Sequence, residues 1–250
     1  LGKGDGTFRP TQDFPTGSGP RSVALGDVNG DGHPDLAIAN LAGDTVSVLL
    51  GKGDGKFRPT QDSPTGRGPF SVAMGDVNGD GHPDLAVANR ASDTVSVLIG
   101  KGDGTFRPTQ DFPAGSGPRS VAMEDVNGDG HLDLVVAQQL SHTVSVLLGK
   151  GDGTFRPTQD FPTGRSPRSV VLADVNGDGH PDLAVASADD NGVSVLLGKG
   201  DGTFLPKQHF RTGLGPQSVA LGDVNGDGRP DLAVANLGDN TVSLLLSTSQ

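Results

Sequence analysis

The chain has 250 residues, with 40 Gly, 18 Pro and no Cys, Trp or Tyr, and only 33% of its residues are hydrophobic. This composition favours tight turns between short elements and disfavours long helices. The formal net charge of −11 argues against nucleic acid as a partner, because phosphate binding needs clustered Lys and Arg. No apolar run approaches the roughly 18 residues of a membrane span. No secretion signal follows Leu1, so we expect a processed or excised segment.

A hexapeptide, Asp-Val-Asn-Gly-Asp-Gly, recurs every 49 residues along the whole chain. Its five copies begin at Asp27, Asp76, Asp125, Asp174 and Asp223. A period of this length fits one four-stranded blade of a β-propeller. The sequence therefore predicts an all-β fold, a five-bladed β-propeller of four-stranded antiparallel blades.

Four strands are expected in each repeat, and in the first repeat they cover residues 22–25, 35–39, 45–50 and about 57–62. We refer to these strands as A, B, C and D. Strand D contains Pro59 and is followed by Pro64, and proline cannot donate a hydrogen bond to a sheet. Strand D is therefore expected at the outer rim, with the apolar residues of strands A to C packed between blades.

The two ends of the chain predict that the ring closes on itself. Residues 1–16 resemble a strand D, residues 217–246 supply strands A to C, and Leu246 follows Leu1 by five times 49 residues. The N-terminal strand D should then pair with the C-terminal strands A to C and complete the last blade, giving one domain over residues 1–250 and a monomer. The alternative, an open solenoid, normally carries distinct polar capping repeats, and this chain has none.

A nine-residue loop, Asp-x-Asn-x-Asp-Gly-x-x-Asp, follows strand A in every repeat. Side-chain oxygens at positions 1, 3, 5 and 9 and a backbone carbonyl at position 7 would supply the hard oxygen ligands that calcium prefers. We therefore expect about five calcium ions, one per blade. The predicted ligand positions are Asp27, Asn29, Asp31, His33 and Asp35; Asp76, Asn78, Asp80, His82 and Asp84; Asp125, Asn127, Asp129, His131 and Asp133; Asp174, Asn176, Asp178, His180 and Asp182; Asp223, Asn225, Asp227, Arg229 and Asp231.

Other interpretations of this loop explain less. An EF-hand needs Glu at position 12, where this chain has Ile38 or Val. A plain hairpin turn would account for Asn-Gly and Asp-Gly, but not for three carboxylates in each loop, which repel one another without a cation. Magnesium fits less well because it demands a stricter octahedron.

The loops, the Leu-Ala-Val-Ala strand after them, and the recurrent Leu-Gly-Lys-Gly-Asp-Gly-Thr-Phe together resemble the FG-GAP and VCBS-type repeats of integrin α-chain propellers and bacterial surface proteins. The resemblance covers the entire chain. It implies a propeller in which the loop between strands A and B binds calcium on one face. Relatives commonly have seven blades, so five blades imply either a smaller ring or assembly with other copies.

Three other features are interpreted as structural. The Gly2-Lys3-Gly4-Asp5-Gly6 segment lacks the Ser or Thr of a phosphate-binding loop and is expected to form a tight turn between strands C and D. The histidines at loop position 7 are expected to be exposed spacers. His142 and His209 lack a second His or Cys at metal-ligand spacing, so neither is expected to be catalytic.

The repeats differ from one another mainly in the D-to-A and B-to-C connections, which lie on the same face of an up-and-down blade, opposite the calcium loops. This variable face is the candidate ligand surface, although neutral drift in exposed loops would give the same pattern. The candidate residues on this face are Arg21, Phe70, Arg119, Arg168, Gln217, Arg90 and Gln139.

Near-identical blades offer no unique cluster of catalytic groups, so we predict a non-catalytic module rather than an enzyme. The main hypothesis is a calcium-stabilised propeller for adhesion or protein recognition, extracellular or at the cell surface. The alternatives are a carbohydrate-binding lectin propeller, which the lack of Trp and Tyr disfavours, a polysaccharide lyase, and a recently amplified or engineered scaffold without a selected ligand. The identity of a protein or glycan partner is left open.

Overall fold

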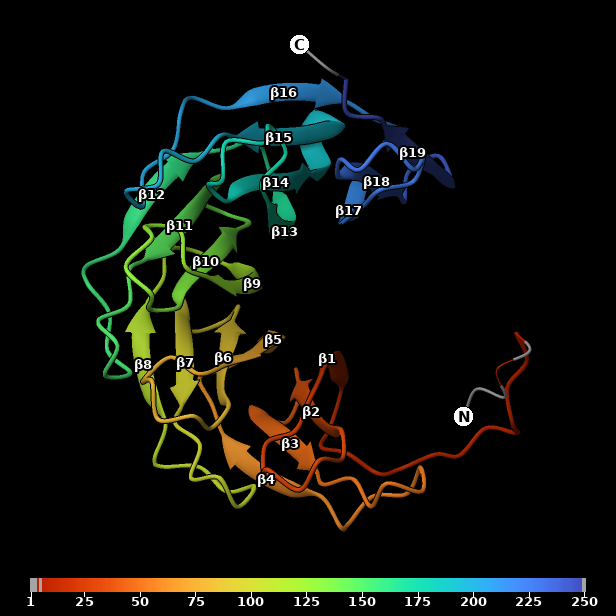
Figure 1. Cartoon of the computed structure of the whole chain (residues 1–250), viewed down its shortest axis with the longest axis vertical. Helices are drawn as coiled ribbons and strands as arrows, with labels where there is room; N and C mark the ends of the chain where they lie inside the picture. Colours follow the sequence, from red (N-terminus) through yellow and green to blue (C-terminus); the bar gives the residue numbers. More distant parts are fainter. Residues whose placement is uncertain (1–3, 5, 249–250) are drawn as a thin grey trace.

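The computed structural model describes residues 4 and 6–248 and consists of five antiparallel sheets arranged around an arc (Figure 1). Four sheets have four strands and the last has three. No helix in the described part of the chain is long and apolar enough to cross a membrane. The predicted all-β propeller fold with five antiparallel blades is confirmed.

The strands follow the 49-residue period. The first blade contains β1 (Pro20–Gly26), β2 (Asp35–Asn40), β3 (Thr45–Leu49) and β4 (Gln61–Pro64), and the second contains β5 (Pro69–Gly75), β6 (Asp84–Asn89), β7 (Thr94–Leu98) and β8 (Gln110–Pro113). The third blade contains β9 (Pro118–Glu124), β10 (Asp133–Gln138), β11 (Thr143–Leu147) and β12 (Gln159–Pro162). The fourth contains β13 (Pro167–Ala173), β14 (Asp182–Ser187), the short 3₁₀ helix η1 (Ala188–Asp190), β15 (Gly192–Leu196) and β16 (Gln208–Arg211), and the fifth contains β17 (Pro216–Gly222), β18 (Asp231–Asn236) and β19 (Thr241–Leu245). Strands A to C lie where the sequence predicts them, whereas strand D begins about four residues later.

Each blade runs in chain order from the centre of the arc to its rim. The innermost strands β1, β5, β9, β13 and β17 line the centre, and β4, β8, β12 and β16 form the outer edge (Figure 1). The prolines of strand D explain this order, since an edge strand tolerates a residue that cannot donate to the ladder. The outer position expected for strand D is confirmed.

Within residues 6–248 the hydrophobic core consists of four separate clusters, each between two consecutive blades. Between the first two blades, Ala37, Val46 and Val48 pack against Leu85 and Val87 of the following sheet. Strand alternation sends neighbouring residues to opposite faces, so every interior blade contributes small and β-branched residues to two interfaces. The other three blade pairs repeat this packing.

The arc is open, and this corrects the predicted closure of the ring. Among the described residues β19 pairs only with β18, and a wide gap separates the fifth blade from the first (Figure 1). Leu1, the expected start of the closing strand, lies outside the described residues. The 49-residue period determines how strands connect within a blade, but closure depends on the angle between blades, which the interface packing sets.

The N-terminal segment lies beside the first blade in the place of a preceding outer strand. The carbonyl of Pro15 accepts a hydrogen bond from Thr60 Oγ1 at 2.7 Å, and the Phe14 ring meets Phe57 edge to face at 5.0 Å. Equivalent contacts join later blades, such as Thr109 Oγ1 to the carbonyl of Pro64. Phe14 and Pro15 therefore pack on the first blade, and the described part of residues 1–16 does not complete the fifth blade.

Both ends of the arc expose faces that are buried in interior blades. Val242 and Leu244 of β19 are 68% and 55% exposed, whereas their counterparts Val46 and Val48 are 0% and 1% exposed. At the other end Val23 of β1 is 56% exposed, whereas its counterpart Val72 is 7% exposed. These values follow directly from the open arc, because no blade in the described part of the chain covers either face.

Candidate functional site

The predicted calcium loop connects the innermost strand of each blade to the next strand, as expected. In the first blade it lies between Gly26 and Asp35. Gly30 and Gly32 have φ of 71° and 80°, a left-handed conformation that glycine adopts without strain. The two glycines fold the chain back so that its polar side chains face their own backbone.

The side-chain oxygens at positions 1 and 3 converge on one backbone amide. Asp31 N donates to Asp27 Oδ1 at 3.2 Å and to Asn29 Oδ1 at 3.1 Å, and Gly32 N donates to Asp27 Oδ2 at 2.7 Å. Asn29 Nδ2 donates to Asp31 Oδ2 at 3.0 Å. The structure thus brings positions 1, 3 and 5 together in one turn.

The same contacts recur in the other four loops. In each, the amide at position 5 donates to the carboxylate at position 1 and to the amide oxygen at position 3, and the position-3 amide nitrogen donates to the position-5 carboxylate. Hydrogen bonds from Asn and from the backbone at His33, His82 and His180 lower the pKa of Asp31, Asp80 and Asp178. These carboxylates are therefore held in their charged form.

The carboxylate at position 9 anchors the loop to the rest of the blade. Asp35 is fully buried, and its two oxygens accept N–H groups from Val28 at 2.9 Å and from Gly51 at 2.7 Å. Val28 belongs to the loop, and Gly51 begins the C-to-D hairpin. Asp35 therefore links the A-to-B loop to the C-to-D hairpin at one end of the blade. The spacing of the predicted calcium ligands did not reveal this role.

Burial shifts the acidity of these anchoring carboxylates. It raises the pKa of Asp84 and Asp133 to about 6, against the opposing effect of two backbone N–H groups on each. Burial also raises the pKa of Asp35 and Asp182. In the fifth blade the N–H of Ser247 lowers the pKa of Asp231.

The loop oxygens fit a hard cation in number and type. Each loop offers three carboxylates, one amide oxygen and a position-7 carbonyl, and a carboxylate oxygen that accepts one hydrogen bond keeps a further lone pair. Among the described residues, however, no three His, Cys, Asp or Glu side chains are grouped as a metal site. The donor chemistry fits calcium, while the oxygens here are satisfied by the loop's own N–H groups.

The position-7 histidines His33, His82, His131 and His180 are exposed, as the sequence predicts, and they also contact the C-to-D hairpin, which the sequence interpretation did not include. The His33 ring lies over Gly53 of the C-to-D hairpin, where an added Cβ would be 2.5 Å from His33 Cε1. His82, His131 and His180 cover Gly102, Gly151 and Gly200 in the same way. Comparing the repeats could have shown this, because Arg229 replaces His in the one loop that no such hairpin follows.

On the opposite side of the blades, the structure brings together several of the candidate ligand residues. The Phe70 ring lies between two guanidinium groups, with Cζ of Arg21 and Arg119 at 4.5 and 4.6 Å from its centroid. Gln139 Oε1 accepts hydrogen bonds from Arg119 Nη1 at 3.1 Å and from Arg90 Nε at 3.2 Å. We call these five residues the Phe70 cluster.

The remaining two candidates make no hydrogen bond with this cluster among the described residues. Burial lowers the pKa of Arg168, the charge of Asp189 opposes this effect, and the like charge of Arg90 adds to it. Gln217 Nε2 donates to the backbone oxygen of Gly215 at 3.1 Å, so it stabilises its own turn. The variable positions therefore do not act as one uniform surface.

His142 has a structural role. It adopts φ of 60°, and its Nδ1 accepts the N–H of Ser166 at 3.1 Å. Asp44 and Asp93 make the equivalent bond in the first two blades, both at 2.8 Å. His142 therefore replaces an aspartate that caps the turn of the following blade.

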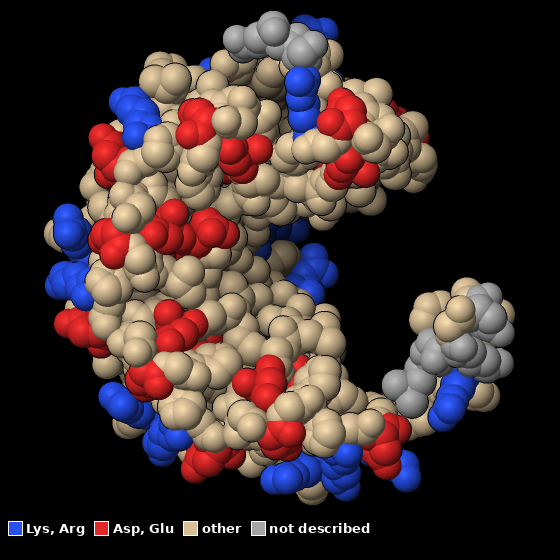
Figure 2. Space-filling view, viewed as in Figure 1, with Lys and Arg blue, Asp and Glu red and all other residues tan. Residues whose placement is uncertain are grey.

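Charge is distributed unevenly over the molecule. Figure 2 shows Asp and Glu in clusters that recur around the arc on the viewed face, with Lys and Arg gathered mainly along its outer edge. This pattern follows the repeat, because every 49-residue unit contributes the same acidic loop.

Comparison with known families supports the repeat assignment. A family model described as an FG-GAP-like repeat matches residues 1–38, 27–87, 76–136, 125–185 and 177–234. These segments share the period of the loops. Comparison with curated protein sequences finds no match.

Solved structures with a similar fold include proteins of several kinds. One is an Agrocybe aegerita lectin that specifically recognises non-reducing terminal N-acetylglucosamine, with TM-score 0.60 and 22% identity over 90% of this chain and 65% of the lectin. Another is BBS1N in complex with ARL6DN, with TM-score 0.63 and 14% identity over 93% of this chain and 69% of that one. A third is a putative 6-phosphogluconolactonase from Bacteroides uniformis, with TM-score 0.63 and 15% identity over 91% of this chain and 71% of that one.

These likenesses concern the fold alone, given their low identity. The chain spans slightly less than two thirds of the lectin's length and about 70% of the other two. A five-blade arc therefore superposes on part of each larger neighbour.

Proposed function

Because the chain belongs to the family of FG-GAP-like repeats, we propose that it is a calcium-binding, non-catalytic module for recognition or adhesion, outside the cell or at its surface. The observation that carries this proposal is the oxygen-rich loop, repeated five times with the same internal contacts. Its three carboxylates lie within nine residues, and a divalent cation would offset their mutual repulsion.

Calcium would act as a structural ion in this proposal. It would be held by the side chains at positions 1, 3 and 5 and the carbonyl at position 7, with the anchoring carboxylate at position 9 adding an oxygen. The ion supplies charge neutralisation and cross-links the loop. Extracellular calcium suits such sites, since modules outside the cell bind at roughly 0.1 to 1 mM.

Recognition is assigned to the side opposite the loops. The Phe70 cluster supports this, because it joins three guanidinium groups to an aromatic ring and an amide, and Arg is enriched at interaction hot spots. The repeated blades would then serve as a rigid scaffold that positions a few varied side chains.

Calcium titration by isothermal calorimetry tests the first half of the proposal. We expect about five sites and loss of one site when Asp125 and Asp129 are both replaced by Asn. The control is Asp103→Asn with Asp152→Asn, an equal charge change at exposed hairpin positions. Heats indistinguishable from dilution would reject calcium binding.

A carbohydrate-binding lectin is the second candidate function. It is supported by the fold likeness to the Agrocybe aegerita lectin, while the absence of Trp and Tyr removes the usual stacking platforms. A glycan array in calcium, with the wild type and Phe70→Arg side by side, separates the two. Phe70→Arg matches the residue of three sister blades, so the fold should tolerate it. Sugar binding that this variant loses would favour the lectin.

A further inference from the structure

The outer strand of the fourth blade carries a cluster of basic residues that its sister strands lack. The first three blades have Thr, Asp and Pro at alternate positions of this segment, for example Thr158, Asp160 and Pro162. The fourth has Lys207, His209 and Arg211, while the intervening Gln208 and Phe210 match the second and third blades. The formal charge of this five-residue segment changes from −1 to +2 with His counted as neutral.

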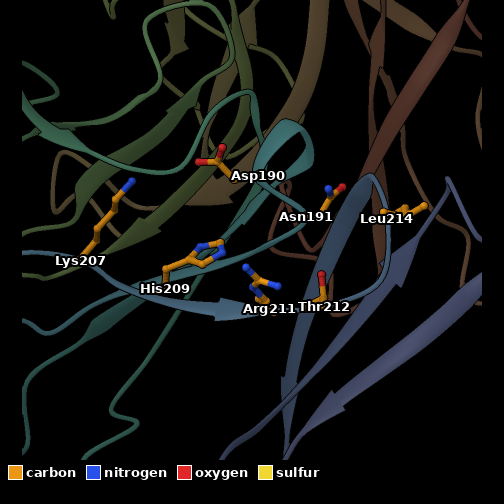
Figure 3. A pocket seen from close by; sticks show the side chains of 7 residues that line it. All are labelled: Asp190, Asn191, Lys207, His209, Arg211, Thr212 and Leu214. Carbon is orange, nitrogen blue, oxygen red and sulfur yellow. The ribbon is translucent and has the colours of Figure 1, made fainter.

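The three replacements share one face, because alternate residues of a strand point the same way. Figure 3 shows the side chains of Lys207, His209 and Arg211 extending to the same side of β16, toward Asp190 and Asn191 on the neighbouring turn. Together with Thr212 and Leu214 they line a pocket of about 480 Å³. Sequence drift at random positions would not confine all three substitutions to one side of the strand.

Donor groups in this pocket are available. Within the described residues, neither the His209 ring nor the Arg211 guanidinium has a hydrogen-bond or ion-pair partner. Lys207 Nζ donates to the carbonyl of Thr163, which leaves two of its three hydrogens free. The pocket therefore presents several unused donors in an otherwise acidic protein.

Asp190, the one carboxylate among the described residues that line the pocket, is already paired. Arg165 Nε donates to Asp190 Oδ1 at 2.8 Å, and Arg165 N donates to Oδ2 at 2.7 Å. This pairing with Arg165 lowers the pKa of Asp190. The other lining polar groups, Asn191 and Thr212, each contact backbone, through Gly215 N and the Gly213 carbonyl. Asp190 therefore makes its hydrogen bonds with Arg165 and none with the basic groups of β16, although the charge of Lys207 also lowers its pKa.

We propose that this face of β16 binds a sugar bearing a carboxylate or sulfate group, as a unit of an acidic polysaccharide. Arg211 offers the planar fork that pairs with a carboxylate through two hydrogen bonds, and Lys207 supplies a second cation. Asn191 and Thr212 can meet sugar hydroxyls, and Leu214 gives an apolar wall. The net charge of −11 opposes long polyanions of either kind, whereas the lining by Asn191, Thr212 and Leu214 favours a sugar ring over a phosphate chain.

The inference rests on the proposed recognition function and gives it a ligand class. It uses the rim between the fourth and fifth blades and not the Phe70 cluster. The two surfaces can therefore be tested separately.

The key variant restores the sister-strand residues, with Lys207→Thr, His209→Asp and Arg211→Pro together. The third blade folds with these residues, so the variant should fold as well. The matched control is Lys150→Thr with Arg156→Asp, at exposed positions of another blade. Its change in formal charge equals that of the triple variant if His209 is neutral, and is one unit smaller if His209 is protonated. Circular dichroism melts establish that both variants are folded.

Binding is measured by fluorescence anisotropy with labelled oligomers of a uronic acid, a sulfated and a neutral oligosaccharide, and an oligothymidylate, and with free sulfate as competitor. We expect the uronic-acid or sulfated oligomer to bind the wild type and the control equally, and the triple variant at least tenfold more weakly. Binding should weaken as salt is raised.

Four results would overturn the proposal: no binding of either acidic oligomer, equal binding of the neutral oligomer, tighter binding of the oligothymidylate, or undiminished binding by the triple variant. If Phe70→Arg loses binding that the triple variant keeps, recognition lies on the Phe70 cluster. That result would reject the β16 site and leave the proposed function standing.

Discussion

The imidazole of His131 lies directly over Gly151, so that a Cβ on this glycine would be 2.4 Å from His131 Cε1. The contact joins the A-to-B loop of the third blade to its own C-to-D hairpin. It occurs in four blades and gives the exposed histidine at loop position 7 a packing role.

Replacing Gly151 by Ala should therefore destabilise the protein by about 1–3 kcal/mol, through backbone strain and the clash with His131. The control is Gly128→Ala, which has the same φ of 73° and no atom closer than 4.0 Å to the added Cβ. Urea unfolding without calcium should show the larger loss for Gly151→Ala. Adding His131→Ala should recover part of it, and equal losses in both single variants would contradict the steric account.

Asp133→Asn should also destabilise the protein, because both Asp133 oxygens accept backbone N–H groups and an amide can accept only one of them. Leaving one buried N–H unpaired costs about 1–3 kcal/mol. Asp152→Asn, at an exposed hairpin, should stay within about 0.5 kcal/mol of the wild type. Urea unfolding without calcium separates this anchoring role from metal binding, and an unchanged midpoint for Asp133→Asn would refute it.

His142→Asp should preserve stability, since Asp44 and Asp93 make the equivalent bond to the following blade. His142→Ala should cost about 1 kcal/mol, because the N–H of Ser166 loses its acceptor. The two variants are compared by thermal melting. Loss of stability in His142→Asp equal to that in His142→Ala would contradict the capping role.

His209→Asp should stabilise the fourth blade by about 0.5–1.5 kcal/mol. In the first three blades an aspartate accepts a short bond from the strand C serine, as Asp160 does from Ser145 at 2.5 Å. Ser194 lies opposite His209 and lacks that acceptor. Restoring the carboxylate should raise the melting temperature, whereas a lower one would show that His209 contributes packing that the aspartate cannot replace.

Sequence reasoning recovered the repeat unit because turn residues and strand alternation act locally. The loop from Asp27 to Asp35 and the outer position of the proline-bearing strand follow from residues within one blade. The prediction of a closed ring was wrong because closure depends on the summed angle between blades, and no local pattern encodes that angle. Two features could not be predicted within one repeat: the contact of His33 with Gly53 and the basic face of β16. Both depend on which side chains meet or which way they point. A comparison between the repeats nevertheless contained a signal for each.

The central claim is that the five acidic loops hold calcium as a structural ion, and a thermal melt with and without a chelator tests it most directly. At ten times the dissociation constant each site adds about 1.4 kcal/mol to the free energy of unfolding. Several sites together should therefore raise the melting temperature clearly in 2 mM calcium relative to EGTA, and the shift should shrink when Asp125 and Asp129 are replaced by Asn. Identical melting temperatures in calcium and in EGTA would contradict the account.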